Sequence, residues 1–258
     1  LFNRKSKMTI PLFKSHYSLG KSILTLEKPE DILQGGPDSI IKLCKDSNLD
    51  EMFLVDDSMS GFLEAFVNSK EEKIKLNFGL RITICEDIKN KSESSLETNS
   101  KYIIFCKNKN GYERLIKIYT LAAKEGFYYH PRIDFTRLKE LWDEKDLLMC
   151  IPFYDSFLHN NFLKGKAAMP DFSFMNPTFL IEDNNIPFDY LIEDRIKKYV
   201  KKGYETVKAK SIFYANKKDF KAYITFRCIN SRTTLDKPNL DHMCSNEFSL
   251  ESWKELEA

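Results

Sequence analysis

The chain has 258 residues, of which 42% are hydrophobic and 30% are charged, a composition typical of a globular protein with a substantial core. Its 40 basic and 38 acidic residues leave a formal charge of +2, which lacks the basic excess of a domain that binds duplex DNA by itself. No apolar run approaches the ~20 residues of a membrane span, and no secretory signal opens the chain. Six cysteines without a C-x-x-C pair favour a reduced, cytoplasmic protein that has neither disulfides nor structural zinc.

The first third of the chain alternates between strand-like and helix-like segments. Residues 1–7 are short and basic, so we predict an N-terminal extension or tag remnant there, followed by one domain at 8–258. Pro37 suits the first turn of a helix. The apolar face of that helix is predicted to be Ile40, Ile41, Leu43 and Cys44. Residues 51–55 predict a strand, and a helix whose apolar residues are Phe62, Leu63, Phe66 and Val67 is predicted after it.

Further strands are predicted at 74–84, 102–106, 147–153 and 178–181, and further helices at 110–126, 188–202 and 217–228. The polar segment 86–101 is predicted to be a variable or disordered loop. Basic runs at 197–202 and 208–210 are interpreted as solvated surface. Strands separated by helices favour parallel βαβ units, so the pattern predicts one α/β domain whose sheet is either open or closed into a barrel.

Residues 110–134 form the most informative segment. Leu115, Ile118, Tyr119 and Ala122 lie on one face of the predicted helix, Gly126 ends it, and an aromatic triplet and Pro-Arg-Ile-Asp follow. This order resembles the PHP (polymerase and histidinol phosphatase) domain of the bacterial DNA polymerase III alpha subunit. The segments 233–239, 246–250 and 253–256 resemble the end of that domain in the polymerase branch, which histidinol phosphatases lack. The resemblance covers 8–256 and implies an irregular (βα) barrel with its site at the C-terminal ends of the strands.

The histidines argue against a catalytic metal cluster, independently of any resemblance. Such a cluster needs several His and carboxylate side chains around two or three ions. The chain has four histidines, none in an H-x-H or H-x-x-x-H spacing: His16, His130, His159 and His242. Each is interpreted as an ordinary surface or core residue.

The resemblance also places the metal-ligand positions of the family on residues that cannot bind metal together. Aligning Tyr17-Ser18 with the first motif of the family puts Leu12 and Lys14 at its two histidines and His16 at an acidic position. The remaining ligand positions carry Asp56, Asp57, Arg81, Phe153, Asn185, Ser211 and Phe213. Asp56 alone keeps a clear ligand, so the resemblance implies a degenerate site with no cofactor and no catalytic residue.

Plainer interpretations exist for some of these positions. Leu12, Phe153 and Phe213 are equally expected in any apolar core, and Asp56-Asp57 could be a loop acid pair or a helix N-cap. We further expect Lys14 and Arg81 to pair with Asp56 or Asp57, because a fixed side-chain cation can neutralise a carboxylate without metal.

The resemblance implies a non-catalytic module of a DNA polymerase III alpha-like replicative polymerase. In that family the domain acts in DNA replication as a scaffold for the polymerase body and in some members docks the proofreading exonuclease, so DNA would be contacted only indirectly or weakly. The chain would be part of, or derived from, a DNA-directed DNA polymerase (a nucleotidyltransferase); it contains no polymerase palm carboxylates, so its residues alone would not polymerise nucleotides. Two alternatives stay open: a stand-alone PHP-fold interaction protein, and an active metal-dependent phosphoesterase or 3'–5' exonuclease with unrecognised ligands.

Overall fold

The structure is a computed structural model that describes residues 2, 8–187, 189–236 and 245–258. Three parts of the sequence predictions therefore lie outside the described residues. They are most of the predicted extension at 1–7, residue 188 of a predicted helix, and the segment 237–244, which contains His242 and part of the predicted tail. The chain divides into two compact units. We name them by their place in the sequence: the terminal unit holds residues 2–78, 182–189 and 208–258, and the central unit holds 79–181 and 190–207.

Three parallel strands organise the terminal unit. β1 (Ile10–Phe13) pairs with β2 (Glu51–Asp56) on one side and with β8 (Glu205–Ile212) on the other. Leu12 lies opposite Phe53 of β2 and opposite Ser211 of β8. Because the strands are parallel, their carboxyl ends share one edge. The helices of this unit are α1 (Ile40–Asp46), α2 (Phe62–Glu71), α7 (Phe220–Ser231), which follows the short η2 (Lys217–Asp219), and α8 (Leu250–Glu257).

β4 (Ser100–Cys106) is the centre of the sheet in the central unit. It is antiparallel both to β3 (Lys75–Ile84) and to β6 (Leu147–Ile151), so the prediction of parallel units was wrong for this strand. The connection from β3 to β4 contains only the short η1 (Glu93–Thr98), and without a crossover helix the chain returns in the opposite direction. Parallel pairings join β6 to β7 (Thr178–Ile181) and β3 to β5 (Arg132–Ile133).

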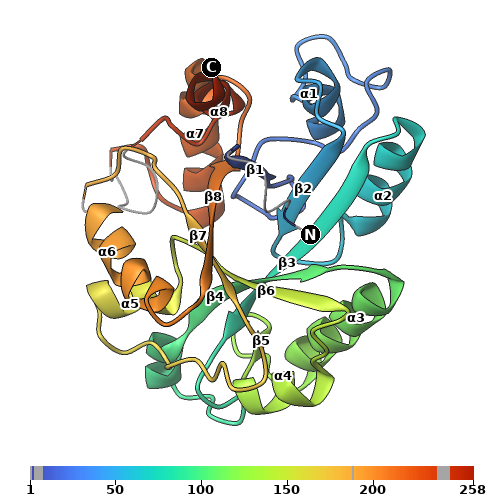
Figure 1. The fold of residues 1–258 in the computed structure, drawn as a ribbon. Coiled ribbons are helices and arrows are strands. Elements are labelled where there is room, and N and C mark those ends of the chain that lie inside the picture. The colour runs from blue at the N-terminus through green and yellow to red at the C-terminus, as the bar shows by residue number, and fades with distance from the viewer. Residues whose placement is uncertain (1, 3–7, 188, 237–244) are drawn as a thin grey trace. The chain divides into compact units, whose positions relative to one another are not determined.

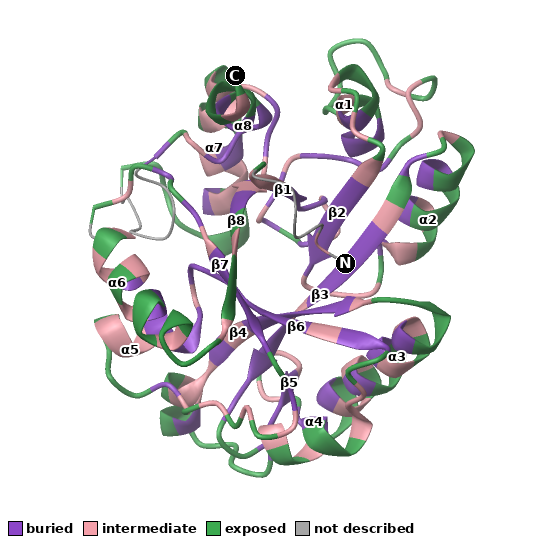
Figure 2. Ribbon diagram, viewed as in Figure 1, coloured by how far each residue is buried: buried purple, intermediate pink, exposed green. Residues whose placement is uncertain are grey.

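The helices of the central unit are α3 (Lys109–Lys124), α4 (Phe135–Leu141), α5 (Phe157–Leu163) and α6 (Asp189–Val200). Two of them, α3 and α6, correspond to predicted helices, whereas α4 and α5 were not predicted. α3 and α4 lie side by side (Figure 1). The strands are largely buried, whereas most helices keep one exposed face (Figure 2). Within the described residues, none of the helices combines the length and the apolar character that crossing a membrane requires.

The hydrogen-bonded strand order is β2-β1-β8-β7-β6-β4-β3-β5, and β2 also pairs with β3. Seven strands therefore form a closed ring of pairings, with β5 beside β3. Residues of β3 and of β8 belong to both units. This topology confirms the predicted α/β fold, an irregular (βα) barrel.

The segment 110–134 folds as predicted and reveals why its residues are needed. Asn108 caps α3 by accepting a hydrogen bond from the backbone N–H of Gly111 (2.9 Å). Gly126 follows the helix because a Cβ there would lie 1.8 Å from the carbonyl oxygen of Arg132. Of the four residues predicted on the inner face, three are fully buried, namely Leu115, Ile118 and Ala122. The fourth, Tyr119, is half-buried.

Arg132 fastens the segment that the sequence predicts to be a variable loop. Its fully buried guanidinium donates from Nη2 to the Asn90 carbonyl (3.0 Å), from Nη1 to Ser95 Oγ (3.1 Å) and from Nε to the Gly126 carbonyl (3.2 Å). Asp134 accepts from the Ile88 N–H (3.1 Å). Segment 86–101 thus includes η1, and its last two residues belong to β4.

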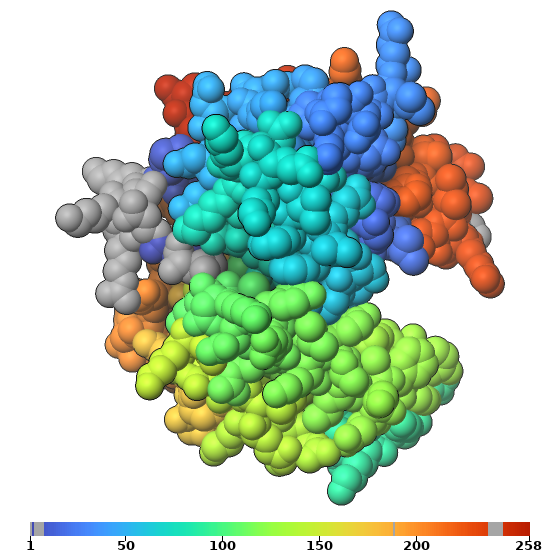
Figure 3. All heavy atoms as spheres, turned by 90° about the vertical axis from the view of Figure 1, so that its right-hand side faces the viewer, coloured from blue at the N-terminus to red at the C-terminus, as the bar shows by residue number. Residues whose placement is uncertain are grey.

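The face of α2 that packs inward is not the one that the sequence predicts. Leu63, Phe66 and Val67 are 69%, 46% and 40% exposed, whereas Ala65, Asn68 and Ser69 are buried. The outer surface of α2, cyan in Figure 3, is not covered by other parts of the chain. The physical reason is a close approach through small residues: a Cβ on Gly61, which precedes α2, would lie 2.7 Å from the ring of Tyr17. Asn68 is held by its amide, which donates to the Leu26 carbonyl (2.8 Å).

Candidate functional site

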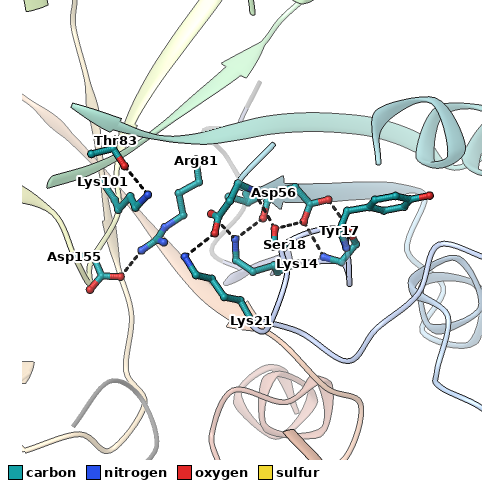
Figure 4. A network of polar contacts seen from close by, with 12 residues as sticks. Lys14, Tyr17, Ser18, Lys21, Asp56, Arg81, Thr83, Lys101 and Asp155 are labelled. Atoms are coloured by element: carbon teal, nitrogen blue, oxygen red, sulfur yellow. Dashed lines mark hydrogen bonds and ion pairs between the residues drawn. The ribbon is translucent and has the colours of Figure 1, made fainter. Parts of the chain in front are cut away.

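A caged carboxylate lies at the carboxyl end of β2 in the terminal unit. Asp56 is completely buried and accepts three hydrogen bonds, all from the loop that follows β1 (Figure 4). Its Oδ1 accepts from the Ser15 N–H (2.9 Å) and from Ser18 Oγ (2.8 Å), and its Oδ2 accepts from Ser15 Oγ (2.6 Å). Two hydroxyl groups and a backbone amide therefore occupy the oxygens of the one carboxylate that the family resemblance retains.

An ion-pair cluster adjoins this cage. The ammonium group of Lys14 donates to the Val55 carbonyl (3.0 Å) and contacts Asp57 Oδ1 (3.1 Å), and Lys21 contacts Asp57 Oδ2 (2.7 Å). The side chain of Lys14 is 6% exposed and that of Lys21 is 37% exposed. Lys14 and Asp57, two residues of the predicted charge pairs, are thus in direct contact, and the ammonium lies where the resemblance places a metal-binding histidine.

Glu182, directly after β7, is a second buried carboxylate, and sequence reasoning missed it. Its Oε1 accepts from Ser211 Oγ (2.8 Å), and its Oε2 accepts from the Ser211 N–H (2.9 Å) and from Asn184 Nδ2 (3.1 Å). The sequence analysis instead assigned Asn185 to the ligand position in this segment, and Asn185 is exposed with a φ of 53°. A usable signal was present, because an acid that directly follows a short apolar strand stands at the C-terminal edge of the sheet.

Lys210 shows that the basic run at 208–210 is not entirely solvated surface. The side chain of Lys210 is 2% exposed, its Nζ donates to the Asp183 carbonyl (2.7 Å), and it lies 3.8 Å from Glu247 Oε2. Burial lowers the pKa of the Lys210 amine, while the nearby carboxylates of Glu247 and Glu182 act in the opposite direction. The interpretation as solvated surface fails here because β8 carries this residue into the interior.

In the central unit, Arg81 of β3 pairs with Asp155, with 2.5 Å between Nη2 and Oδ2. Figure 4 also draws this pair, together with the bond from Lys101 Nζ to Thr83 Oγ1 (2.6 Å). Phe153 is buried edge-on against Tyr154, with 5.0 Å between ring centroids. The expected pairing of Arg81 with Asp56 or Asp57 would join residues of different units, and it stays a prediction.

The remaining predicted positions offer no ligand for a metal. Leu12 is buried in the core, and Phe213 is half-buried between the rings of Tyr223 (5.7 Å) and Phe248 (5.2 Å). Among the described residues, no three His, Cys, Asp or Glu side chains converge closely enough to hold an ion. A divalent cation near Asp56 would have to displace three donors and lie beside the ammonium of Lys14. The residues present therefore do not fit the metal cluster that the resemblance would otherwise imply.

The comparisons with known proteins agree with this architecture. The model of the PHP domain matches residues 34–172, which is more than half of the chain. The chain is 26% identical over 232 residues to the DNA polymerase III subunit alpha of Borreliella burgdorferi, covering 84% of this chain and 20% of that protein. It is 38% identical over 85 residues to the Helicobacter pylori subunit (32% and 7% covered), and 27% identical over 158 residues to the Aquifex aeolicus subunit (58% and 14% covered).

The matched region thus spans a fifth or less of the length of these relatives. The family model and the closed ring of strand pairings lead to the same conclusion: the chain belongs to the PHP domain family.

Proposed function

We propose that this chain is a non-catalytic PHP module of a DNA polymerase III alpha-like replicative polymerase, and that it serves DNA replication as a structural scaffold. Its partners would be the polymerase body and the proofreading exonuclease. The relatives that match the chain are alpha subunits, which favours the polymerase branch of the family. The near-neutral charge supports contact with protein rather than a direct grip on DNA.

The observation that carries the non-catalytic half of this proposal is the cage around Asp56. Metal-assisted phosphoester hydrolysis needs carboxylate oxygens free to bind an ion, and an open position at which that ion lowers the pKa of a water molecule. Both oxygens of Asp56 instead accept hydrogen bonds from Ser15 and Ser18, and Lys14 brings a positive charge beside Asp57. These contacts make a stable polar interior at the end of β2, which supports a role that needs no metal-activated water.

Metal content and hydrolysis test this half directly. The protein would be purified without chelator, its Zn, Mn and Fe measured by mass spectrometry, and its hydrolysis of bis-p-nitrophenyl phosphate assayed with and without added Mn²⁺. We expect substoichiometric metal and no hydrolysis above the buffer blank. Stoichiometric metal together with hydrolysis that EDTA abolishes would instead establish the metal-dependent phosphoesterase.

The scaffold half is tested by association. A DNA polymerase III alpha core that lacks its own PHP domain should co-elute with this chain in gel filtration and should gain primer-extension activity in its presence. Folded bovine serum albumin at the same concentration is the control for non-specific stabilisation. Failure to co-elute would argue against the scaffold and favour the stand-alone interaction protein.

A further inference from the structure

Two Lys–Ser dipeptides make the same set of contacts in the terminal unit. Lys14-Ser15 follows β1, and Lys210-Ser211 lies near the end of the neighbouring β8. Each serine donates both its backbone N–H and its hydroxyl to the two oxygens of one buried carboxylate. Ser15 does so to Asp56 at 2.9 and 2.6 Å, and Ser211 does so to Glu182 at 2.9 and 2.8 Å.

The lysine of each dipeptide also repeats its role. Its ammonium donates to a backbone carbonyl directly adjacent in sequence to the clasped acid, at Val55 in one case and at Asp183 in the other. Each ammonium then approaches a second acid: Lys14 lies 3.1 Å from Asp57, and Lys210 lies 3.8 Å from Glu247. We call this combination of contacts a Lys–Ser clasp.

The contacts of a buried ammonium group must offset the free-energy cost of removing its charge from water. Two acids held near one another in a low-dielectric interior repel, and an unpaired buried charge of either sign is costly. At each clasp the lysine places a positive charge beside the acids while the serine saturates one carboxylate with hydrogen bonds. The lysine side chains are 6% and 2% exposed, so water does not screen these charges effectively.

We propose that the two Lys–Ser clasps are built-in cation sites, in which Lys14 and Lys210 supply the positive charge that holds acidic strand ends together without any metal ion. This inference deepens the proposed non-catalytic function and rests on it. The second clasp also anchors the C-terminal segment: Ser245 Oγ donates to the Asn184 carbonyl, and Lys217 contacts Glu247 (3.4 Å). Through Glu247, the Lys210 clasp thus links β8 to the segment 245–257.

The test compares buried with exposed lysines by thermal unfolding in EDTA. Lys14→Met and Lys210→Met should each lower Tm by roughly 6–15 °C, because each removes the buried positive charge beside an acid and leaves the carbonyl of Val55 or Asp183 without its ammonium donor. The matched controls are Lys21→Met, which contacts the same Asp57 from a more exposed position, and Lys208→Met on the same strand as Lys210; each should change Tm by less than about 2 °C. Lys210→Met should in addition accelerate proteolysis within 245–257, which Lys14→Met should not.

If a methionine variant yields no folded protein, Ser15→Ala and Ser211→Ala remove one hydroxyl each and keep the comparison available. Lysine variants that melt together with their controls would overturn the clasps, even in a protein free of metal. If the protein instead contains stoichiometric metal while the lysine variants still have a lower Tm than their controls, the non-catalytic function is rejected and the clasps are retained. The two failures are therefore distinguishable.

Discussion

The two units bury cations in different ways. In the central unit, the guanidinium of Arg132 donates to two backbone carbonyls and a serine hydroxyl, all neutral acceptors. In the terminal unit, Lys14 and Lys210 lie beside carboxylates at the ends of parallel strands. Arg132 therefore fastens one segment of the chain to another through neutral acceptors, whereas Lys14 and Lys210 contact acids.

The largest effect is expected where that fastening is broken. Arg132→Met would leave the carbonyl of Gly126 and the hydroxyl of Ser95, both on buried residues, and the carbonyl of Asn90 without this donor. We expect a loss of roughly 3–5 kcal/mol in the free energy of unfolding, measured by urea denaturation. Arg137→Met is the matched control, since that arginine contacts Glu125 and Glu140 at the surface and should cost no more than about 1 kcal/mol. Equal losses in the two variants would contradict the fastening role.

Much of this architecture was accessible from the sequence because it depends on periodicity. The strand at 178–181 matches β7, and the helix at 110–126 corresponds to α3 with its inner face as predicted. The buried face of α2 was not accessible in this way. Apolar spacing favoured its large side chains, but the close approach at Gly61 admits only small ones.

The candidate site was less predictable, for a different physical reason. Charged side chains normally remain in water, so Lys210 gave no local sign of its burial, and for Glu182 only its place directly after a short apolar strand hinted at a role in the site. Their partners come from neighbouring strands that are distant in sequence, and only the strand order brings Ser211 next to Glu182. Lys14 and Asp57 were named together because the family resemblance supplied that long-range information.

The cage in the terminal unit should respond to the loss of a single acceptor. Asp56→Asn preserves shape, but the amide nitrogen cannot accept a hydrogen bond, so at least one of the three bonds that Ser15 and Ser18 donate to the carboxylate would be lost. We expect the free energy of unfolding to fall by roughly 2–4 kcal/mol in urea denaturation. Asp50→Asn, at an exposed position just before β2, is the control and should be nearly neutral. A neutral Asp56→Asn would show that the cage does not stabilise the fold.

A smaller effect should depend on pH. Burial alone would raise the pKa of Glu247, but the Ser252 hydroxyl and the ammonium groups of Lys210 and Lys217 outweigh it and lower the pKa below its ordinary value of 4.5. A lowered carboxyl pKa stabilises the fold above pH 4.5, and this contribution is lost as the pH falls through the folded-state pKa. Glu247→Gln should therefore cost roughly 1–2 kcal/mol at pH 7 and progressively less below pH 4.5, as urea titrations across this range would reveal. A difference that is constant with pH would argue against the pairing with Lys210.

The smallest effect concerns the outer face of α2, and it decides between the face predicted from the sequence and the face observed. Leu63 is 69% exposed, so Leu63→Glu should change the free energy of unfolding by no more than about 0.5 kcal/mol. Ala65→Glu, two residues along the same helix, would force a charge into a completely buried position and should cost several times more. Urea denaturation of the two variants in parallel measures the contrast. If Leu63→Glu lowered the free energy of unfolding more than Ala65→Glu, the large apolar side chains would have to face inward. The close packing at Gly61 would then not determine how α2 sits in the terminal unit.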